Sequence, residues 1–132
     1  MTMKELIFVG SSKEDLLEFP DEVQDETGYA LYLEQMGDKP PKSKILKGFG
    51  NANVREIVDN DSSGTYRTVY TVEKPEFVFV LHAFQKKSKS GIATPQQEIN
   101  KVKARLKEVD VLYNELKEEG HGKKDKVRKK LR

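Results

Sequence analysis

The sequence predicts an α+β fold, in which a small, twisted and mostly antiparallel sheet is packed against helices. Three strand-like runs follow one another between residues 54 and 84 with short turns between them, which predicts a meander. An earlier apolar run at residues 6–9 is separated from them by two helical segments and must return to the same sheet. A long amphipathic segment after residue 94 supplies a helix to cover it. The predicted order is β-α-α-β-β-β-α, with no internal repeat.

The N-terminal part is predicted to form one strand and two helices. Residues 6–9 are a short apolar run typical of a buried strand. Ser12 and Asp15 resemble a capping box, so a short helix follows. Pro20 fits the first turn of a second helix, which runs to about residue 36, where glycine and then two prolines end it.

The middle of the chain contains a basic loop and then the three strands of the meander. Residues 42–50 carry three lysines and two glycines, and we expect a loop there. Residues 54–58 and 65–72 are predicted strands, joined by a turn rich in Asp, Asn, Ser and Gly. Residues 77–84 are continuously apolar except for one histidine, which favours a central strand buried on both faces.

The last predicted element is the amphipathic helix. Thr94 is the expected cap, Pro95 the first residue, and about 24 helical residues follow. Its apolar positions recur at alternating steps of three and four: Ile99, Val102, Leu106, Val109, Tyr113 and Leu116. We expect residues 1–118 to form one domain. Residues 119–132 are expected to be a disordered basic tail, since the last twelve residues hold seven Lys or Arg and one Asp.

Composition excludes several classes of protein. The 132 residues suit one small domain. The absence of cysteine excludes a disulfide scaffold, a thiolate zinc site and a cysteine nucleophile, and two histidines are too few for a histidine-rich metal site. No apolar run approaches the length of a membrane span, and the first is too short for a signal peptide. The sequence therefore predicts a cytoplasmic protein that binds no metal or cofactor and does not associate with a membrane.

Charge is divided unevenly along the chain. Residues 1–40 hold 3 Lys or Arg against 10 Asp or Glu, whereas residues 41–132 hold 21 against 12. Such a division suggests two surfaces with different partners, of which the basic one could bind a polyanion such as nucleic acid. A well-charged surface that keeps a small protein soluble is an equally good interpretation of charge alone.

The candidate catalytic residues are cations and one histidine on the strands of the meander, where they can converge on one part of the sheet. They are Arg55, Arg67, His82 and Lys86, and the candidate RNA-binding lysines in the adjoining loops are Lys44, Lys47, Lys87 and Lys89. Such a set suits RNA cleavage, in which a 2′-hydroxyl loses its proton and attacks the adjacent phosphorus. Fixed cations stabilise the charge that builds on the phosphoryl oxygens, and a histidine can exchange a proton near neutral pH. Each residue also has an ordinary structural interpretation, as a strand cation, a core histidine or a solvated loop.

Four segments resemble the phage-derived, HigB-like branch of the RelE/ParE toxin superfamily. They are residues 81–95 (LHAFQKKSKSGIATP), 28–33 (GYALYL), 47–50 (KGFG) and 65–70 (TYRTVY). The resemblance covers about residues 4–113. It implies a small twisted sheet with helices packed on it, and the toxin of a type II toxin–antitoxin pair. Its usual activity is ribosome-dependent cleavage of mRNA, which inhibits translation, and its usual partner is a helix-turn-helix antitoxin, with a heterotetrameric complex as one arrangement.

The same resemblance implies roles for particular residues. Catalytic cations of RelE-type toxins correspond to Arg55, Arg67 and Lys86, and His82 belongs to the branch's own motif. A late catalytic tyrosine of RelE-type toxins has no counterpart, since Tyr113 lies too far along the last helix, so His82 is the candidate base. Gyrase-poisoning ParE-type toxins share the fold, which leaves a non-catalytic toxin or a nuclease-dead regulatory partner as the alternative. The partner is expected to contact residues 12–36 or the last helix.

Overall fold

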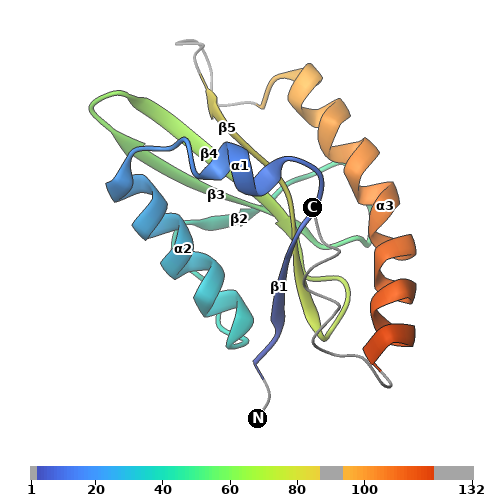
Figure 1. The fold of residues 1–132 in the computed structure, drawn as a ribbon. Helices are drawn as coiled ribbons and strands as arrows, with labels where there is room; N and C mark the ends of the chain where they lie inside the picture. Colours follow the sequence, from blue (N-terminus) through green and yellow to red (C-terminus); the bar gives the residue numbers. More distant parts are fainter. Residues whose placement is uncertain (1–2, 87–93, 121–132) are drawn as a thin grey trace.

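The computed structural model describes residues 3–86 and 94–120. Within these residues, eight elements follow one another (Figure 1): β1 (Glu5–Phe8), α1 (Ser12–Leu16), α2 (Asp21–Gln35), β2 (Ser43–Ile45), β3 (Val54–Asp61), β4 (Gly64–Thr71), β5 (Phe77–Lys86) and α3 (Gln96–Gly120). The predicted α+β class is confirmed. Of the predicted basic tail, residues 119 and 120 belong to α3, and residues 121–132 lie outside the described part of the chain.

One five-stranded sheet holds the molecule together, in the order β1-β5-β4-β3-β2. β3, β4 and β5 form the predicted antiparallel meander, and β1 returns to pair in parallel with β5. β2 falls within residues 42–50, for which the sequence predicts a loop. Its three residues pair with β3, Ser43 opposite Ile57, and they carry no apolar alternation by which a strand could be recognised.

Helices cover both faces of this sheet, so the fold has three layers (Figure 1). α3 packs on one face, called here the α3 face, where Val102, Val109 and Leu116 join a core that includes Ile7, Val54, Val69, Phe79 and Phe84. α1 and α2 pack on the other, the α2 face, where Leu16, Val23 and Leu31 meet Ile57, Tyr70, Val78 and Val80. None of the described helices is long and apolar enough to span a membrane.

A β-bulge in β5 decides which side chains reach the α3 face. Val69 lies opposite His82, whereas the next residue, Tyr70, lies opposite Val80, so Leu81 is the extra residue. Because side chains alternate along a strand, one inserted residue exchanges the two faces for everything that follows. His82, and with it Phe84 and Lys86, therefore point to the α3 face instead of the α2 face.

Candidate functional site

Charged side chains occupy a row that runs across four strands on the α3 face. Lys44 of β2 lies opposite Glu56 of β3, Glu56 lies opposite Val69 of β4, and Val69 lies opposite His82 of β5. Directly opposed residues project from the same side of a sheet. The row therefore places a lysine beside a carboxylate, with a histidine two strands further along, beyond Val69.

Arg67 and Lys86 lie in the next two rows of the same face. Arg67 is paired with Phe84, one step along β5 from His82, and Lys86 is one step further, opposite Thr65. In an antiparallel sheet such diagonal neighbours are about 7–8 Å apart, within reach of long side chains. The structure thus brings together three of the four predicted catalytic residues, Arg67, His82 and Lys86.

A buried ion pair fixes Arg67. Its Nη1 donates to Oε1 of Glu56 at 2.9 Å, and the two side chains are 4% and 1% exposed. The hydroxyl of Thr94 donates to Oε2 of Glu56 at 2.9 Å and lies 3.5 Å from Arg67 Nη1. Buried charges are tolerated only when paired and hydrogen-bonded. Glu56 therefore orients Arg67 and, through Thr94, ties the approach to α3 to the sheet.

Lys86 extends the positive charge of Arg67 along β5. Lys86 is 8% exposed. Burial lowers the pKa of Lys86, and the positive charges of Arg67 and Lys44 lower it further against the opposing effect of Glu56. A lysine in this state gives up a proton more readily than one in water. Arg67, Lys86 and Lys44 together form a cationic group suited to a phosphate.

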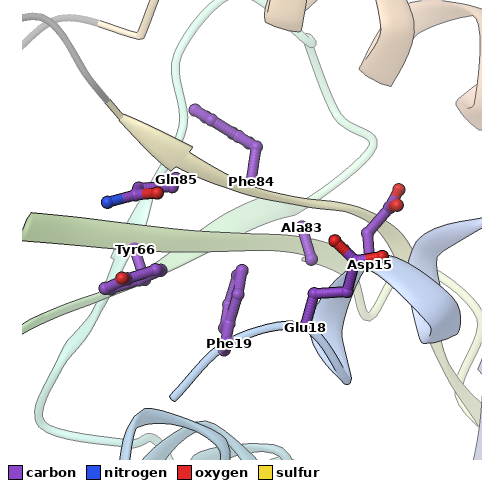
Figure 2. A pocket seen from close by; sticks show the side chains of 7 residues that line it. All are labelled: Asp15, Glu18, Phe19, Tyr66, Ala83, Phe84 and Gln85. Carbon is purple, nitrogen blue, oxygen red and sulfur yellow. The ribbon is translucent and has the colours of Figure 1, made fainter. Parts of the chain in front are cut away.

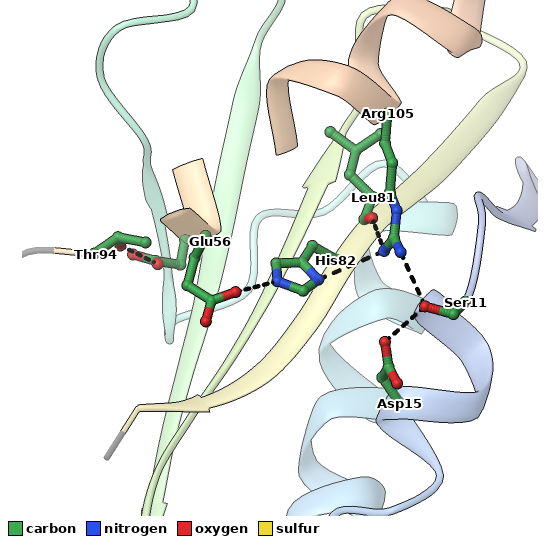
Figure 3. Close-up of polar contacts among 8 residues, drawn as sticks. Ser11, Asp15, Glu56, Leu81, His82, Thr94 and Arg105 are labelled. Atoms are coloured by element: carbon green, nitrogen blue, oxygen red, sulfur yellow. Dashed lines mark hydrogen bonds and ion pairs between the residues drawn. The ribbon is translucent and has the colours of Figure 1, made fainter. Parts of the chain in front are cut away.

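His82 links the sheet to α3 and to α1 (Figure 3). Its Nε2 lies 2.5 Å from Oε1 of Glu98, and its Nδ1 lies 3.5 Å from Nη1 of Arg105. Arg105 also donates to the carbonyl of Leu81 and to Oγ of Ser11, each at 2.9 Å. Burial lowers the pKa of His82, although Glu98 acts in the opposite direction. The lowered pKa favours the neutral imidazole, and the guanidinium beside Nδ1, which can only donate, favours the tautomer with its proton on Nε2.

Arg55 does not join this group, contrary to the expectation that all four candidates line one surface. It lies opposite Tyr70 on the α2 face. Its Nη1 donates to Oε2 of Glu34 at 3.0 Å, its Nε donates to Asn53, and the Tyr70 hydroxyl donates to the same Glu34 oxygen. Burial raises the pKa of Tyr70, which keeps that hydroxyl a donor. Arg55 thus neutralises a buried carboxylate of α2 and has a structural role.

The predicted RNA-binding lysines are only partly described. Lys44 is exposed at the edge of the charged row, and Lys47 is exposed in the segment between β2 and β3. Lys87 and Lys89 lie outside the described residues.

Three residues of the site were not predicted: Glu56, Thr94 and Glu98. Glu56 could have been found, because it alternates with apolar Val54 and Val58 in a strand and so must face the core. Thr94 was expected to cap α3, but its hydroxyl bonds Glu56. No three His, Asp or Glu residues are grouped as metal ligands in the described part of the chain.

Two hollows among the described residues lie away from this site. One, of about 290 Å³, lies between α1 and the strands β4 and β5 and is lined by Asp15, Glu18, Phe19, Tyr66, Ala83, Phe84 and Gln85 (Figure 2). The other, of about 390 Å³, lies beside the first turns of α2 and includes Glu22, Asp25, Glu26, Asp59 and Asp61. Both are acidic and repel a polyanion, so neither is a candidate RNA site.

Residues 14–107 match the family model described as phage derived protein Gp49-like (DUF891). The chain belongs to this family. Its fold is similar to that of a free double mutant of the E. coli toxin RelE, with a TM-score of 0.52 and 19% identity over 80% of this chain and 95% of that one. The RelBE2 toxin–antitoxin complex of Mycobacterium tuberculosis gives a TM-score of 0.44 and 18% identity over 67% and 97%. No curated protein matches. The predicted phage-derived family and RelE-type fold are confirmed.

Proposed function

We propose that this Gp49-like protein is the toxin of a type II toxin–antitoxin pair and an mRNA endonuclease that acts on the translating ribosome without a metal ion. The observation that carries the proposal is the meeting of Arg67, Lys86 and Lys44 on one face of the sheet, beside the hydrogen-bonded His82 and Glu98. The RelE-type fold and the family support it.

The cationic group matches the needs of RNA cleavage. Arg67, held by Glu56, has a fixed position just below the surface, since its side chain is 4% exposed, and its positive charge would act on a phosphoryl oxygen bound above it. Lys86 lies beside it and can stabilise the same charge. Fixed cations of this kind typically contribute about a hundred- to a thousandfold in rate, so they could perform the work of a metal ion. Lys44 and Lys47, with Lys87 and Lys89, would bind the RNA backbone and make affinity depend on salt.

The partners follow from the same proposal. The ribosome and its mRNA would meet the α3 face, and a helix-turn-helix antitoxin would hold the toxin inactive in the cytoplasm. The best surface for the antitoxin is the outer side of α2, where Tyr29, Tyr32 and Met36 are 61%, 46% and 40% exposed. The first turns of the same helix are acidic, with Asp21, Glu22, Asp25 and Glu26 all exposed. Such a surface fits a partner segment with apolar and basic side chains.

The direct test is cleavage of mRNA in a purified translation system. We expect the purified protein to cut mRNA inside the reading frame when ribosomes are translating it. The same RNA should stay intact when ribosomes are left out. The variant Lys86→Gln should lose most of the cleavage. A protein that leaves mRNA intact but inhibits DNA supercoiling by gyrase would instead support the non-catalytic alternative.

A further inference from the structure

The base of the proposed reaction can be identified from the contacts around His82. We propose that Glu98, oriented by His82, is the group that takes the proton from the 2′-hydroxyl of the RNA. This inference rests on the proposed function. It replaces His82 as the candidate base, because the His82 side chain is 3% exposed whereas that of Glu98 is 23% exposed.

Both nitrogens of His82 are occupied in a way that prevents it from acting directly. A guanidinium can only donate hydrogen bonds, so Nδ1 of His82, which faces Arg105, must be the unprotonated nitrogen. The ring proton is then on Nε2 and is donated to Oε1 of Glu98. His82 therefore has no accepting nitrogen turned to the substrate. It is a positioning residue, and Arg105 fixes its tautomer.

Glu98 stands where a base is needed. It lies in the first turn of α3. The same end of α3 is preceded by Thr94, whose hydroxyl contacts both Glu56 and Arg67. Glu98 is hydrogen-bonded to His82, and His82 lies in the row of paired residues next to that of Arg67. The Glu98 carboxylate thus lies at the border of the cationic group.

The contacts also leave Glu98 chemically suited to accept a proton. His82 bonds only Oε1, and among the described residues no hydrogen bond is made to Oε2. Because His82 is neutral, it orients the carboxylate without cancelling its charge, as an imidazolium would. Burial of the histidine and the positive charges of Arg105 and Lys101 keep it neutral, against the effect of Glu98 itself.

The reaction then balances without any further reagent. Oε2 of Glu98 takes the 2′-hydroxyl proton while the 2′-oxygen forms a bond to phosphorus. The bond from phosphorus to the 5′-oxygen breaks, and that oxygen takes a proton from the ammonium group of Lys86, whose lowered pKa favours its release. The products are a 2′,3′-cyclic phosphate and a 5′-hydroxyl. Exchange with water returns the proton from Glu98 and supplies one to Lys86.

The test uses two messages in the purified translation system, one normal and one with sulfur in place of the scissile 5′-oxygen. Sulfur leaves without being protonated, so it rescues the loss of an acid but not the loss of a base. Glu98→Gln keeps the shape of the side chain and an acceptor for His82. Glu108→Gln, at an exposed position further along α3, is the matched control.

We expect Glu98→Gln to lower kcat about a hundred- to ten-thousandfold on both messages with little change in KM. Lys86→Gln should be slow on the normal message and largely restored on the sulfur message, and Glu108→Gln should resemble the parent. Two results would overturn the assignment of Glu98 as base. One is a Glu98→Gln variant that cleaves the normal message at a rate within a fewfold of the parent's, and the other is a Glu98→Gln variant whose cleavage rate is restored on the sulfur message. A parent that cleaves neither message would instead refute the proposed function itself.

A second measurement does not depend on activity. Nitrogen NMR of the His82 ring should show Nε2 protonated and Nδ1 unprotonated at pH 7, and Arg105→Gln should change the balance of the two tautomers. A ring protonated on Nδ1 in the parent would contradict the proposed contacts, whatever the cleavage assay shows.

Discussion

Arg67 and Glu56 are the residues on which the site depends most, and neither can be changed alone without consequence for stability. The carboxylate of Glu56 is buried, and it accepts hydrogen bonds from Arg67 and from Thr94. Removing one member of such a pair leaves an uncompensated charge in the interior. A loss of activity in an Arg67 variant must therefore be separated from a loss of folding.

Arg67→Ala should lower the free energy of unfolding by about 3–5 kcal/mol, the usual cost of breaking a buried ion pair. Urea denaturation of the purified protein measures it. Glu56→Gln combined with Arg67→Gln should recover much of the loss, because no charge is then left unpaired, and that double variant is the proper test of catalysis. Equal stability of the parent and Arg67→Ala would show that the pair is not buried in solution.

His82 should make stability depend on pH. Its pKa is lowered below the ordinary 6.5 by burial, so the folded protein binds this proton less tightly than the unfolded chain does. The contribution of His82 to the free energy of unfolding is fully present above pH 6.5. It is lost as the pH falls below that value, by at most about 1.4 kcal/mol per pH unit. Denaturation at pH 7 and pH 5 should show a larger loss for the parent than for His82→Gln. The same loss in both proteins would exclude His82 as the cause.

The candidate site could be predicted in part at this scale. Arg67 and Lys86 could be proposed from the sequence because cations at those positions match both the chemistry and the family motif; the structure places them on one face, and their catalytic role stays a prediction. Arg55 was misplaced because a strand has two faces, and its own sequence does not say which one meets the other cations. Only the pairing with Tyr70 and the contact with Glu34 show that Arg55 faces α2.

Among the elements, α3 carries the clearest agreement between sequence and structure. Its apolar period of three and four residues predicted the helix, and Val102, Val109 and Leu116 are buried as expected. Leu106 is only partly buried beside the same core. It is therefore a poorer probe of the core than its place in the pattern suggests.

Leu116→Ala should lower the free energy of unfolding by about 2–5 kcal/mol, because it leaves a cavity between α3 and the sheet. Leu106→Ala should cost less. Val111, on the same helix, is 59% exposed, so Val111→Ala should stay within about 0.5 kcal/mol of the parent. Thermal or urea denaturation of the three variants measures the series. Similar values for positions 111 and 116 would mean that α3 does not pack as described.

Two features of the sheet could not be predicted from the sequence. The bulge at Leu81 lies in a run that is apolar on both sides, so the pattern gives no sign of the residue at which the faces exchange. β2 is too short to show a period, and it exists because the edge of β3 offers hydrogen bonds. Both features shape the candidate site, since the bulge turns His82 and Lys86 toward α3 and β2 brings Lys44 to the row.

At the scale of the whole molecule, the charge division along the chain becomes a division between two sides. α2 and α3 lie on opposite sides of the sheet (Figure 1). The cationic group is on the α3 face, and the exposed acidic and apolar side chains of α2 are on the other side. A partner on α2 would leave the catalytic residues uncovered.

Asp25→Lys combined with Glu26→Lys should weaken antitoxin binding at least about tenfold, since the partner surface is expected to be basic, while mRNA cleavage by the free toxin is unchanged. Titration calorimetry with the purified antitoxin measures the affinity. Glu108→Lys, on α3, is the control. If the α3 control lost antitoxin binding and the α2 variant did not, the antitoxin surface would have to be assigned to α3.

The most direct test of the central claim, that this face of the sheet cleaves mRNA, is to map mRNA 5′ ends in bacteria after brief induction of the parent and of Lys86→Gln, both shown to be folded. We predict growth arrest with new 5′ ends inside reading frames for the parent, and neither for the variant. Growth arrest by the parent without new 5′ ends, or the same new ends with Lys86→Gln, would contradict the claim.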